Sequence, residues 1–190
     1  MNSLGTHDTP RILTLLGAGG EYRDRSKEWR ANFRLSPDQR RRGTELLRAA
    51  ALLLFCFPGS PTVYYGDEAG MEGFEDPFNR QTYPWGREDP NLRAWFGALG
   101  RLRRDHPALR RGDLRFVAAQ GPLLAFTRSV EEETVLFLCN AGDTPERLTL
   151  DLPALPTPLL GDVVWEETDD GVVFALEARS AGALGVSVEL

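Results

Sequence analysis

The stretch Leu4-Gly-Thr-His-Asp-Thr-Pro-Arg11 decides the fold of this chain, because it places an imidazole and a carboxylate between a strand and a helix. Residues 1–4 predict a short apolar strand, and the turn after it carries His7 and Asp8. In proteins that alternate strands and helices, catalytic groups gather in the turns at the strand ends. We therefore take His7 and Asp8 as candidate site residues.

A helix is predicted directly after this turn. Thr9 and Pro10 are typical of a helix start, since a threonine side chain can cap the first turn and proline fits the first helical position. The run over residues 11–16 then has helical character, and Gly17 and the glycine pair 19–20 are expected to end it.

Two other interpretations of the His7-Asp8 pair stay open at this point. The aspartate can be a helix cap beside a surface histidine, which is the commoner role of such a dipeptide. It can also belong to a metal-dependent phosphohydrolase site, but such sites need further histidine and aspartate ligands. The only other histidine is His106, so no metal site and no cofactor is expected.

The composition is typical of a folded protein without membrane-spanning segments. Apolar residues make up 42% of 190 residues, which is enough for a core. No stretch reaches the roughly 20 apolar residues of a membrane span, and no charged-then-apolar segment marks the chain for export. Cys56 and Cys139 each lie in an apolar run, which favours buried free thiols in a reducing compartment. The sequence thus predicts a cytoplasmic location and no membrane partner.

Charge is distributed unevenly along the chain. Residues 1–115 carry 19 basic against 15 acidic side chains, whereas residues 116–190 carry 3 against 13. An acidic C-terminal region argues against nucleic acid as a partner.

A second strand is predicted over residues 62–65, where β-branched and aromatic residues precede Gly66-Asp67-Glu68. Carboxylate side chains follow the C-terminal end of this strand, as Asp8 follows the first strand. The loop over residues 69–89 is long enough to be functional. It carries the aromatic residues Phe74, Phe78, Tyr83 and Trp85.

Helices are predicted before and after this second strand in the sequence. Ser36-Pro37 predicts a helix start, and helical spacing continues to Phe57; Asp89-Pro90 opens another helix that His106-Pro107 ends. His106 is expected to be a helix-end residue without a catalytic role. Residues 18–36 form a loop or a partly helical insertion, which two aromatic residues, Trp29 and Phe33, are expected to hold in place.

From Asp113 onward, apolar residues alternate with polar ones in six or seven short segments separated by turn-forming residues. This pattern predicts an antiparallel β-sandwich. We expect two domains, residues 1–110 and 111–190. Two strand-helix units cannot close a barrel and leave exposed edges, so residues 1–105 are expected to associate with another copy or chain, or to be the end of a larger protein.

Four stretches resemble motifs of one known family. Asn2-Ser-Leu-Gly-Thr-His-Asp-Thr-Pro-Arg11 resembles the motif at the end of barrel strand seven of the α-amylase superfamily of glycoside hydrolases. Phe57-Pro-Gly-Ser-Pro-Thr-Val-Tyr-Tyr-Gly-Asp-Glu-Ala-Gly70 resembles that of strand eight. Asp76-Pro-Phe-Asn-Arg80 resembles the loop after strand eight, and Leu102-Arg-Arg-Asp-His-Pro-Ala-Leu-Arg110 resembles the last barrel helix. Within the superfamily, the neopullulanase, cyclomaltodextrinase and maltogenic amylase group is the most similar.

The resemblance implies an α/β plus all-β fold: the last two βα units of a (β/α)8 TIM barrel, followed by a C-terminal antiparallel β-sandwich. The chain departs from the family in a longer insertion over residues 18–42. The implied substrate is a maltooligosaccharide or related α-glucan, cleaved at α-1,4- or α-1,6-glucosidic bonds in maltodextrins, cyclodextrins or pullulan. Self-association or an N-terminal barrel portion would then cover the exposed barrel edge.

The resemblance also implies roles for individual residues. Asp8 would be the carboxylate that stabilises the transition state, by holding ring hydroxyls as the sugar flattens. His7 would donate to the same sugar, and Asp76 and Arg80 would contact a neighbouring glucose unit. Two further residues are implied to shape the substrate pocket, namely Tyr65 and Glu68.

A retaining glycosidase also needs a nucleophile and a general acid about 5–5.5 Å apart. In the family both lie at the ends of strands four and five, and no carboxylate of this chain matches those motifs, so the chain alone is predicted to be inactive. One alternative is a non-catalytic carbohydrate-binding or assembly module, which an exposed aromatic platform in the sandwich would favour. Another is an unrelated βα protein, which four ordered motifs argue against.

Overall fold

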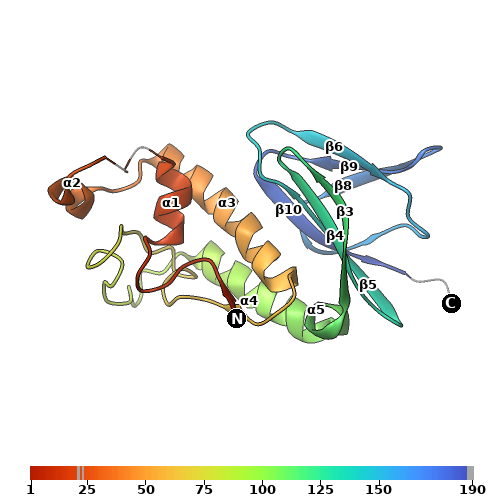
Figure 1. The fold of residues 1–190 in the computed structure, drawn as a ribbon, viewed down its shortest axis with the longest axis horizontal. Helices are drawn as coiled ribbons and strands as arrows, with labels where there is room; N and C mark the ends of the chain where they lie inside the picture. The colour runs from red at the N-terminus through yellow and green to blue at the C-terminus, as the bar shows by residue number, and fades with distance from the viewer. Residues whose placement is uncertain (21, 23, 188–190) are drawn as a thin grey trace. The chain divides into compact units, whose positions relative to one another are not determined.

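The computed structural model describes residues 1–20, 22 and 24–187, and its ribbon is drawn in Figure 1. The chain divides into two compact units. The first unit comprises residues 1–51 and 60–97, and the second comprises residues 52–59 and 98 onward. Five helices are described: α1 (Ile12–Ala18), α2 (Lys27–Asn32), α3 (Pro37–Cys56), α4 (Pro90–Asp105) and α5 (Pro107–Arg111).

Two short parallel strands lie in the first unit. β1 (Asn2–Ser3) pairs with β2 (Pro61–Thr62), with Asn2 opposite Pro61 and Ser3 opposite Thr62. The strand expected over residues 62–65 is therefore shorter than predicted and begins earlier. Pairing defines a strand, and among the described residues β1 offers only two positions to pair with.

The prediction that Thr9 caps α1 is wrong. The helix begins at Ile12, and Arg11 precedes it without a side-chain capping hydrogen bond. The Thr9 hydroxyl instead accepts a hydrogen bond from the backbone of Thr6 at 2.9 Å, and the Thr9 N–H donates to the Thr6 carbonyl at 3.3 Å. Thr9 thus closes the turn that carries His7 and Asp8.

Gly17 does not end α1, which continues to Ala18. A Cβ atom at Gly17 would lie 2.7 Å from the carbonyl oxygen of Gln39, and one at Gly43 would lie 2.9 Å from that of Leu13. The two glycines therefore permit close contact between α1 and α3. Gly19, at φ 62°, ends the helix as expected.

The predicted starts of α3 and α4 are confirmed. Ser36 Oγ accepts a hydrogen bond from the Gln39 N–H at 3.3 Å, and Pro37 is the first residue of α3. At α4, the Asp89 carboxylate accepts from the N–H groups of Asn91 and Leu92, at 3.0 and 3.1 Å. Both side chains satisfy N–H groups that a helix leaves without a partner.

The insertion is held in place by aromatic contacts, as predicted. Trp29 and Phe33 lie on or beside α2, with ring centroids 4.7 Å apart. Both rings contact Phe74, at 5.9 and 5.3 Å, and Tyr22 contacts it at 4.9 Å. Phe74 is 1% exposed, so the loop after β2 anchors the insertion.

The second unit contains the predicted antiparallel sandwich. One sheet has the order β3 (Asp113–Gln120), β4 (Leu123–Val130), β5 (Glu133–Asn140), β10 (Ser180–Val186) and β7 (Thr157–Gly161). The other has the order β6 (Glu146–Leu150), β9 (Gly171–Leu176) and β8 (Val164–Thr168). The eight described strands exceed the predicted six or seven, because β7 contains Pro158 and does not show the alternating pattern. Proline is tolerated there since β7 lies at a sheet edge.

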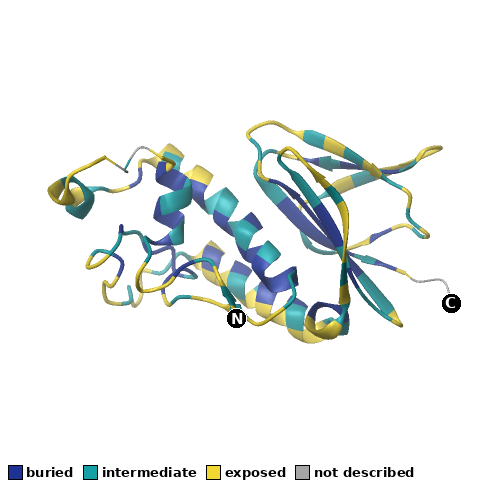
Figure 2. Ribbon diagram, in the orientation of Figure 1, coloured by how far each residue is buried: buried dark blue, intermediate teal, exposed yellow. Residues whose placement is uncertain are grey.

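Apolar side chains from both sheets form one core. Ala125, Leu136 and Leu184 of the larger sheet belong to the same buried cluster as Val172 and Phe174 of the smaller sheet. The central strands β5 and β10 are buried along most of their length (Figure 2).

A second group of aromatic rings, besides the one around Phe74, lies on and near the larger sheet of the sandwich. Phe126 and Phe137 stack at 4.7 Å, and Phe57, just after α3, meets Phe126 edge-on at 5.9 Å.

A short helix, α5, comes after α4 and was not predicted. His106 precedes it, as the helix-end residue that the sequence indicates, with Nδ1 2.5 Å from Oε1 of Glu133. The other oxygen of Glu133 accepts a hydrogen bond from the Ala108 N–H at 2.9 Å. Glu133 of β5 thus caps α5.

Both cysteines are buried and free, as expected. Burial raises the pKa of the Cys56 thiol to about 12 and that of the Cys139 thiol to about 11. In the described part of the chain, no helix has the length and apolar character needed to cross a membrane.

Candidate functional site

Asp8 lies on the exposed turn between β1 and α1. Its side chain is 69% exposed, and that of His7 is 65% exposed. His7 Nε2 lies 3.1 Å from Asp8 Oδ2. The Asp8 N–H donates to the Thr6 hydroxyl at 3.2 Å, which helps to fix the turn. The carboxylate is therefore positioned by local hydrogen bonds and remains accessible to a ligand.

Arg80 brings the loop after β2 to this turn. Its Nη2 donates to Asp8 Oδ1 at 3.3 Å, and its Nε donates to the His7 carbonyl at 3.1 Å. The same Nε lies 3.2 Å from Asp76 Oδ1. Four residues that the sequence singled out, His7, Asp8, Asp76 and Arg80, are thus brought together around one guanidinium group.

A buried amide that the sequence analysis missed supports this contact. Asn79 is 0% exposed, and its Nδ2 donates to the carbonyls of His7 and Thr9 at 2.7 and 2.8 Å. Its Oδ1 is buried without a hydrogen-bond partner among the described residues. The signal in the sequence was the place of Asn79 in the stretch Asp76-Pro-Phe-Asn-Arg80, for which the resemblance gave roles only to Asp76 and Arg80.

Arg11 is a second residue that the sequence analysis missed. Its side chain is 0% exposed and lies 3.4 Å from Asp67 Oδ1. It also donates to the Tyr65 carbonyl, and its guanidinium lies over the rings of Tyr64 and Tyr65, at 4.3 and 4.6 Å. Arg11 therefore ties the start of α1 to the chain after β2.

Asp67 is the acidic partner of this buried pair. Burial raises the pKa of Asp67 to about 6, against the opposing effect of the Arg11 guanidinium. Two nitrogens of Arg11, Nε and Nη2, have no hydrogen-bond partner within the part of the chain that is described.

Tyr65 and Glu68 occupy different positions relative to this group. Tyr65 is 41% exposed, and its hydroxyl donates to the Gln81 carbonyl at 2.7 Å, next to Arg80 in the chain. Glu68 accepts a hydrogen bond from the Gly66 N–H at 2.8 Å and so fixes the turn after β2. Tyr65 borders the candidate site, whereas the hydrogen bond of Glu68 lies within the turn after β2.

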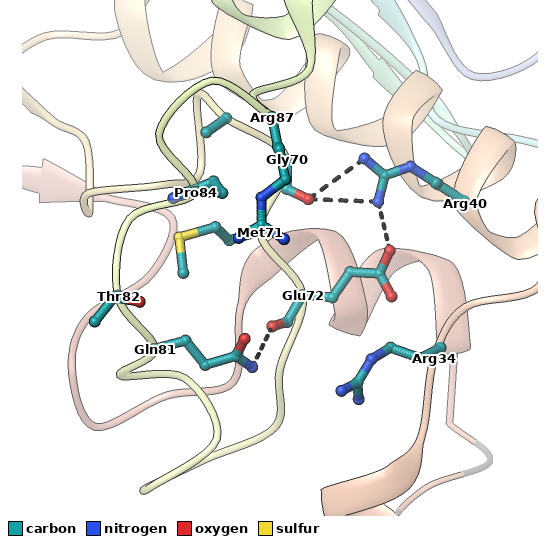
Figure 3. A pocket seen from close by; sticks show the side chains of 10 residues that line it. Arg34, Arg40, Gly70, Met71, Glu72, Gln81, Thr82, Pro84 and Arg87 are labelled. Carbon is teal, nitrogen blue, oxygen red and sulfur yellow. Dashed lines mark hydrogen bonds and ion pairs between the residues drawn. The ribbon is translucent and has the colours of Figure 1, made fainter.

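A cavity of about 360 Å³ lies on the same loop, beside α3. Figure 3 shows Arg34, Arg40 and Glu72 on one side of it and Gln81 and Pro84 on the other. Arg40 forms ion pairs with Glu72 and, at 3.5 Å, with Asp89. Charged and polar side chains line much of the cavity, as suits a hydroxylated ligand better than an apolar one.

The arrangement around Asp8 offers hydrogen-bond acceptors and donors to a polar ligand. Asp8 presents an accessible carboxylate, His7 an imidazole and Arg80 a guanidinium. Within residues 1–20, 22 and 24–187, no cluster of three histidine, cysteine or acidic side chains suits a metal ion.

Comparison with known proteins identifies relatives of one kind. An amylopullulanase from Thermoanaerobacter thermohydrosulfuricus is 41% identical over 157 residues, which cover 77% of this chain and 10% of the relative. A maltogenic alpha-amylase from Bacillus acidopullulyticus is 34% identical over 159 residues, which cover 80% of this chain and 23% of that enzyme. This chain is a homologue of α-amylase-family glycoside hydrolases.

Solved structures agree with the sequence relatives. The alpha-amylase of Geobacillus thermoleovorans, crystallised with acarbose, matches 99% of the present chain with a TM-score of 0.77 and 25% identity. The match covers 39% of that enzyme. The present chain thus spans well under half the length of these proteins that it matches. No family model matches the sequence.

Proposed function

We propose that this chain is the C-terminal part of a retaining glycoside hydrolase that cleaves α-1,4- or α-1,6-glucosidic bonds in maltodextrins, cyclodextrins or pullulan. In this proposal, residues 1–110 supply the last two βα units of a (β/α)8 barrel, and residues 111–190 form its C-terminal sandwich. The observation that carries it is the accessible Asp8 carboxylate after β1, held by Arg80 from the loop after β2. The parallel pairing of β1 with β2 supports it.

Asp8 would act by differential binding. Its carboxylate accepts hydrogen bonds from two hydroxyls of the sugar at the cleaved bond. These bonds strengthen as the ring flattens and gains positive charge, so they stabilise the transition state more than the substrate. His7 donates to the same sugar. Asp76 and Arg80 hold the adjoining glucose unit, and Tyr65 borders the pocket.

The nucleophile and the general acid would come from parts of the enzyme outside residues 1–190. A retaining mechanism places those two carboxyl groups about 5–5.5 Å apart on either side of the bond. Asp8 is then the third carboxylate of the site and does not itself form or break a covalent bond. The acarbose complex of the Geobacillus thermoleovorans alpha-amylase supports an oligosaccharide-like ligand.

The alternative of a carbohydrate-binding module receives less support from the sandwich. Phe126, Phe137 and Phe174 are fully buried, and Trp165 is half-buried. Phe116 is 55% exposed and meets Phe126 edge-on at 6.0 Å. A single exposed phenylalanine is a small surface for binding a sugar chain.

The test uses the complete enzyme that contains this sequence, with maltoheptaose and pullulan as substrates. Asp8→Asn should lower kcat by orders of magnitude and leave the thermal unfolding midpoint unchanged. Asp38→Asn is the matched control, since Asp38 is a 90% exposed carboxylate of α3 paired with Arg41. Near-normal turnover of Asp8→Asn would contradict the assignment, as would hydrolysis by residues 1–190 alone.

A further inference from the structure

Arg11 is a charged residue buried only three positions after Asp8. Its side chain is 0% exposed. Removing a charged group from water is costly unless its surroundings compensate, so arginine is rarely buried completely without partners. Additional barrel strands can only bury this side chain further, and its contacts within the chain therefore do not depend on an exposed surface.

The guanidinium group of Arg11 is held on its face and at its edge. It lies over the rings of Tyr64 and Tyr65, with its central carbon 4.3 and 4.6 Å from the ring centroids. At its edge, Nη1 donates to the Tyr65 carbonyl and lies 3.4 Å from Asp67 Oδ1. Cation–π contacts and charge-assisted hydrogen bonds both restrict a planar group of this kind. The side chain thus has little freedom to move.

The backbone of Arg11 is fixed as well. Its N–H donates to the Gly73 carbonyl at 2.8 Å, and its carbonyl accepts from the Leu15 N–H at 3.1 Å, in the first turn of α1. The Gly73 N–H donates in return to the Thr14 hydroxyl at 2.8 Å. Arg11 is therefore attached to the loop after β2 through both its backbone and its side chain.

The link from Arg11 back to Asp8 is short and stiff. Only Thr9 and Pro10 separate them, and the proline ring fixes its own φ angle and restricts the residue before it. The turn is closed by the Thr9 N–H, which donates to the Thr6 carbonyl at 3.3 Å, and by the Thr9 hydroxyl, which accepts from the Thr6 N–H at 2.9 Å. A displacement of Arg11 is therefore transmitted to Asp8.

Asp67 lies beside both ends of this turn. It is 4% exposed, and its Oδ1 faces Arg11. A Cβ atom placed on Gly5 would lie 3.6 Å from its Oδ2, so the second oxygen lies next to the residue that begins the turn. One buried carboxylate thus contacts the side chain at the end of the turn and adjoins the backbone at its start.

We propose that Arg11 is a positioning residue for the Asp8 carboxylate, with Asp67 as its anchor. This inference rests on the proposed function and adds a residue that acts through Asp8 without touching the sugar. Arg80 holds the carboxylate itself, whereas Arg11 fixes the backbone three residues further along. Because a displacement of about 1 Å at a catalytic group can lower turnover about 100-fold, the loss of Arg11 should reduce catalysis.

The first measurement is steady-state kinetics of the complete enzyme with maltoheptaose. Arg11→Met should lower kcat about 10- to 100-fold and change KM by less than about threefold, because Arg11 does not contact the substrate. Arg11→Lys keeps the charge without the planar fork and should recover part of the loss. Arg128→Met is the matched control, since it removes a buried arginine from the second unit; its kcat should be unchanged at temperatures where every variant is folded.

A double-mutant cycle separates positioning from a merely structural role. If Arg11 acts through Asp8, adding Arg11→Met to Asp8→Asn should lower kcat by less than about a further threefold. Effects that multiply would show that Arg11 acts independently of Asp8 and would overturn the proposal. Arg11→Lys repeats the cycle if Arg11→Met does not fold. A normal kcat for Asp8→Asn alone would instead count against the proposed function.

A second measurement, proton NMR of the 190-residue chain, does not depend on catalysis. The sequence contains two histidines. His7 Nε2 lies 3.1 Å from Asp8 Oδ2, whereas the ring of His106 contacts Glu133 in the second unit. Arg11→Lys should shift the ring-proton signal of His7 and leave that of His106 in place. An unchanged His7 signal would show that Arg11 does not position the turn, and a shift of both signals would show a general loosening of the fold; either result overturns the proposal.

Discussion

Arg80 Nη2 donates a hydrogen bond to Asp8 Oδ1 at 3.3 Å, across a separation of 72 residues in the chain. The contact joins the turn after one strand to the loop after the next. Through Nε the same guanidinium also reaches the His7 carbonyl and Asp76. Arg80 therefore fixes the direction of the Asp8 carboxylate and leaves Oδ2 beside the imidazole of His7.

Replacing Arg80 should impair substrate handling more than stability. Arg80→Met should lower kcat/KM of the complete enzyme by at least about tenfold, because Asp8 loses its partner and the adjoining glucose loses a donor. The free energy of unfolding should change by less than about 1 kcal/mol, since the ion pairs are exposed. Steady-state kinetics and urea denaturation check the two parts. Arg41→Met removes a more exposed ion pair, from α3, and serves as the control. Unchanged kinetics for Arg80→Met would contradict the contact.

Asn79→Ala should destabilise the first unit. The substitution removes two hydrogen bonds from a fully buried amide and leaves the carbonyls of His7 and Thr9 without these donors. The expected loss in the free energy of unfolding is about 1–3 kcal/mol. Asn91→Ala, at an exposed position of α4, should change it by less than about 0.5 kcal/mol. Urea denaturation followed by circular dichroism measures both, and equal values for the two variants would show that Asn79 does not hold the turn.

Local signals in the sequence predicted local structure well. Ser36-Pro37 and Asp89-Pro90 begin helices where the side chains can cap them. The Thr9-Pro10 signal failed because the Thr9 hydroxyl accepts from Thr6 and closes the turn instead. Alternation predicted most strands of the sandwich, but not β7, whose proline is acceptable only because β7 lies at an edge.

The candidate site could be predicted only in part. His7, Asp8, Asp76 and Arg80 were found through motif resemblance, and the structure brings them together. Two buried polar residues, Asn79 and Arg11, received no role from the sequence. The carbonyl groups to which they donate lie 54 or more positions away in the sequence. No periodic pattern in the sequence predicts which distant carbonyl a side chain will bind.

The buried Asp67 should make stability depend on pH. Its pKa rises from 3.8 in the reference state to about 6 in the fold, chiefly through burial. Between these values the folded state binds more protons than the unfolded state. The contribution of Asp67 is therefore fully present below about pH 4 and is lost as pH rises through about 6, by up to about 3 kcal/mol.

Asp67→Asn isolates this effect. The free energy of unfolding of the wild type, minus that of Asp67→Asn, should fall between about pH 4 and pH 7, because the amide does not titrate. Urea denaturation over this pH range measures the difference. Asp38→Asn, at an exposed site, supplies the control series. A difference that stays flat, or rises with pH, would show that Asp67 is not held in its neutral form.

Arg128 should be a principal stabilising residue of the second unit. It is 2% exposed and donates from Nη1 to the Cys56 carbonyl at 2.7 Å, and from Nη2 and Nε to the Gly112 carbonyl at 2.8 and 3.1 Å. It thereby satisfies a carbonyl at the end of α3 that the helix itself cannot pair.

Arg128→Met keeps much of the side-chain volume but leaves both carbonyls without this donor, so the free energy of unfolding should fall by about 2–4 kcal/mol. Arg115→Met, at an exposed position of the neighbouring strand β3, should change it by less than about 0.5 kcal/mol. Urea denaturation followed by circular dichroism compares the two variants. If they unfold at the same urea concentration, the sandwich does not depend on Arg128. A loss confined to Arg128→Met shows that one buried guanidinium couples the end of α3 to β4.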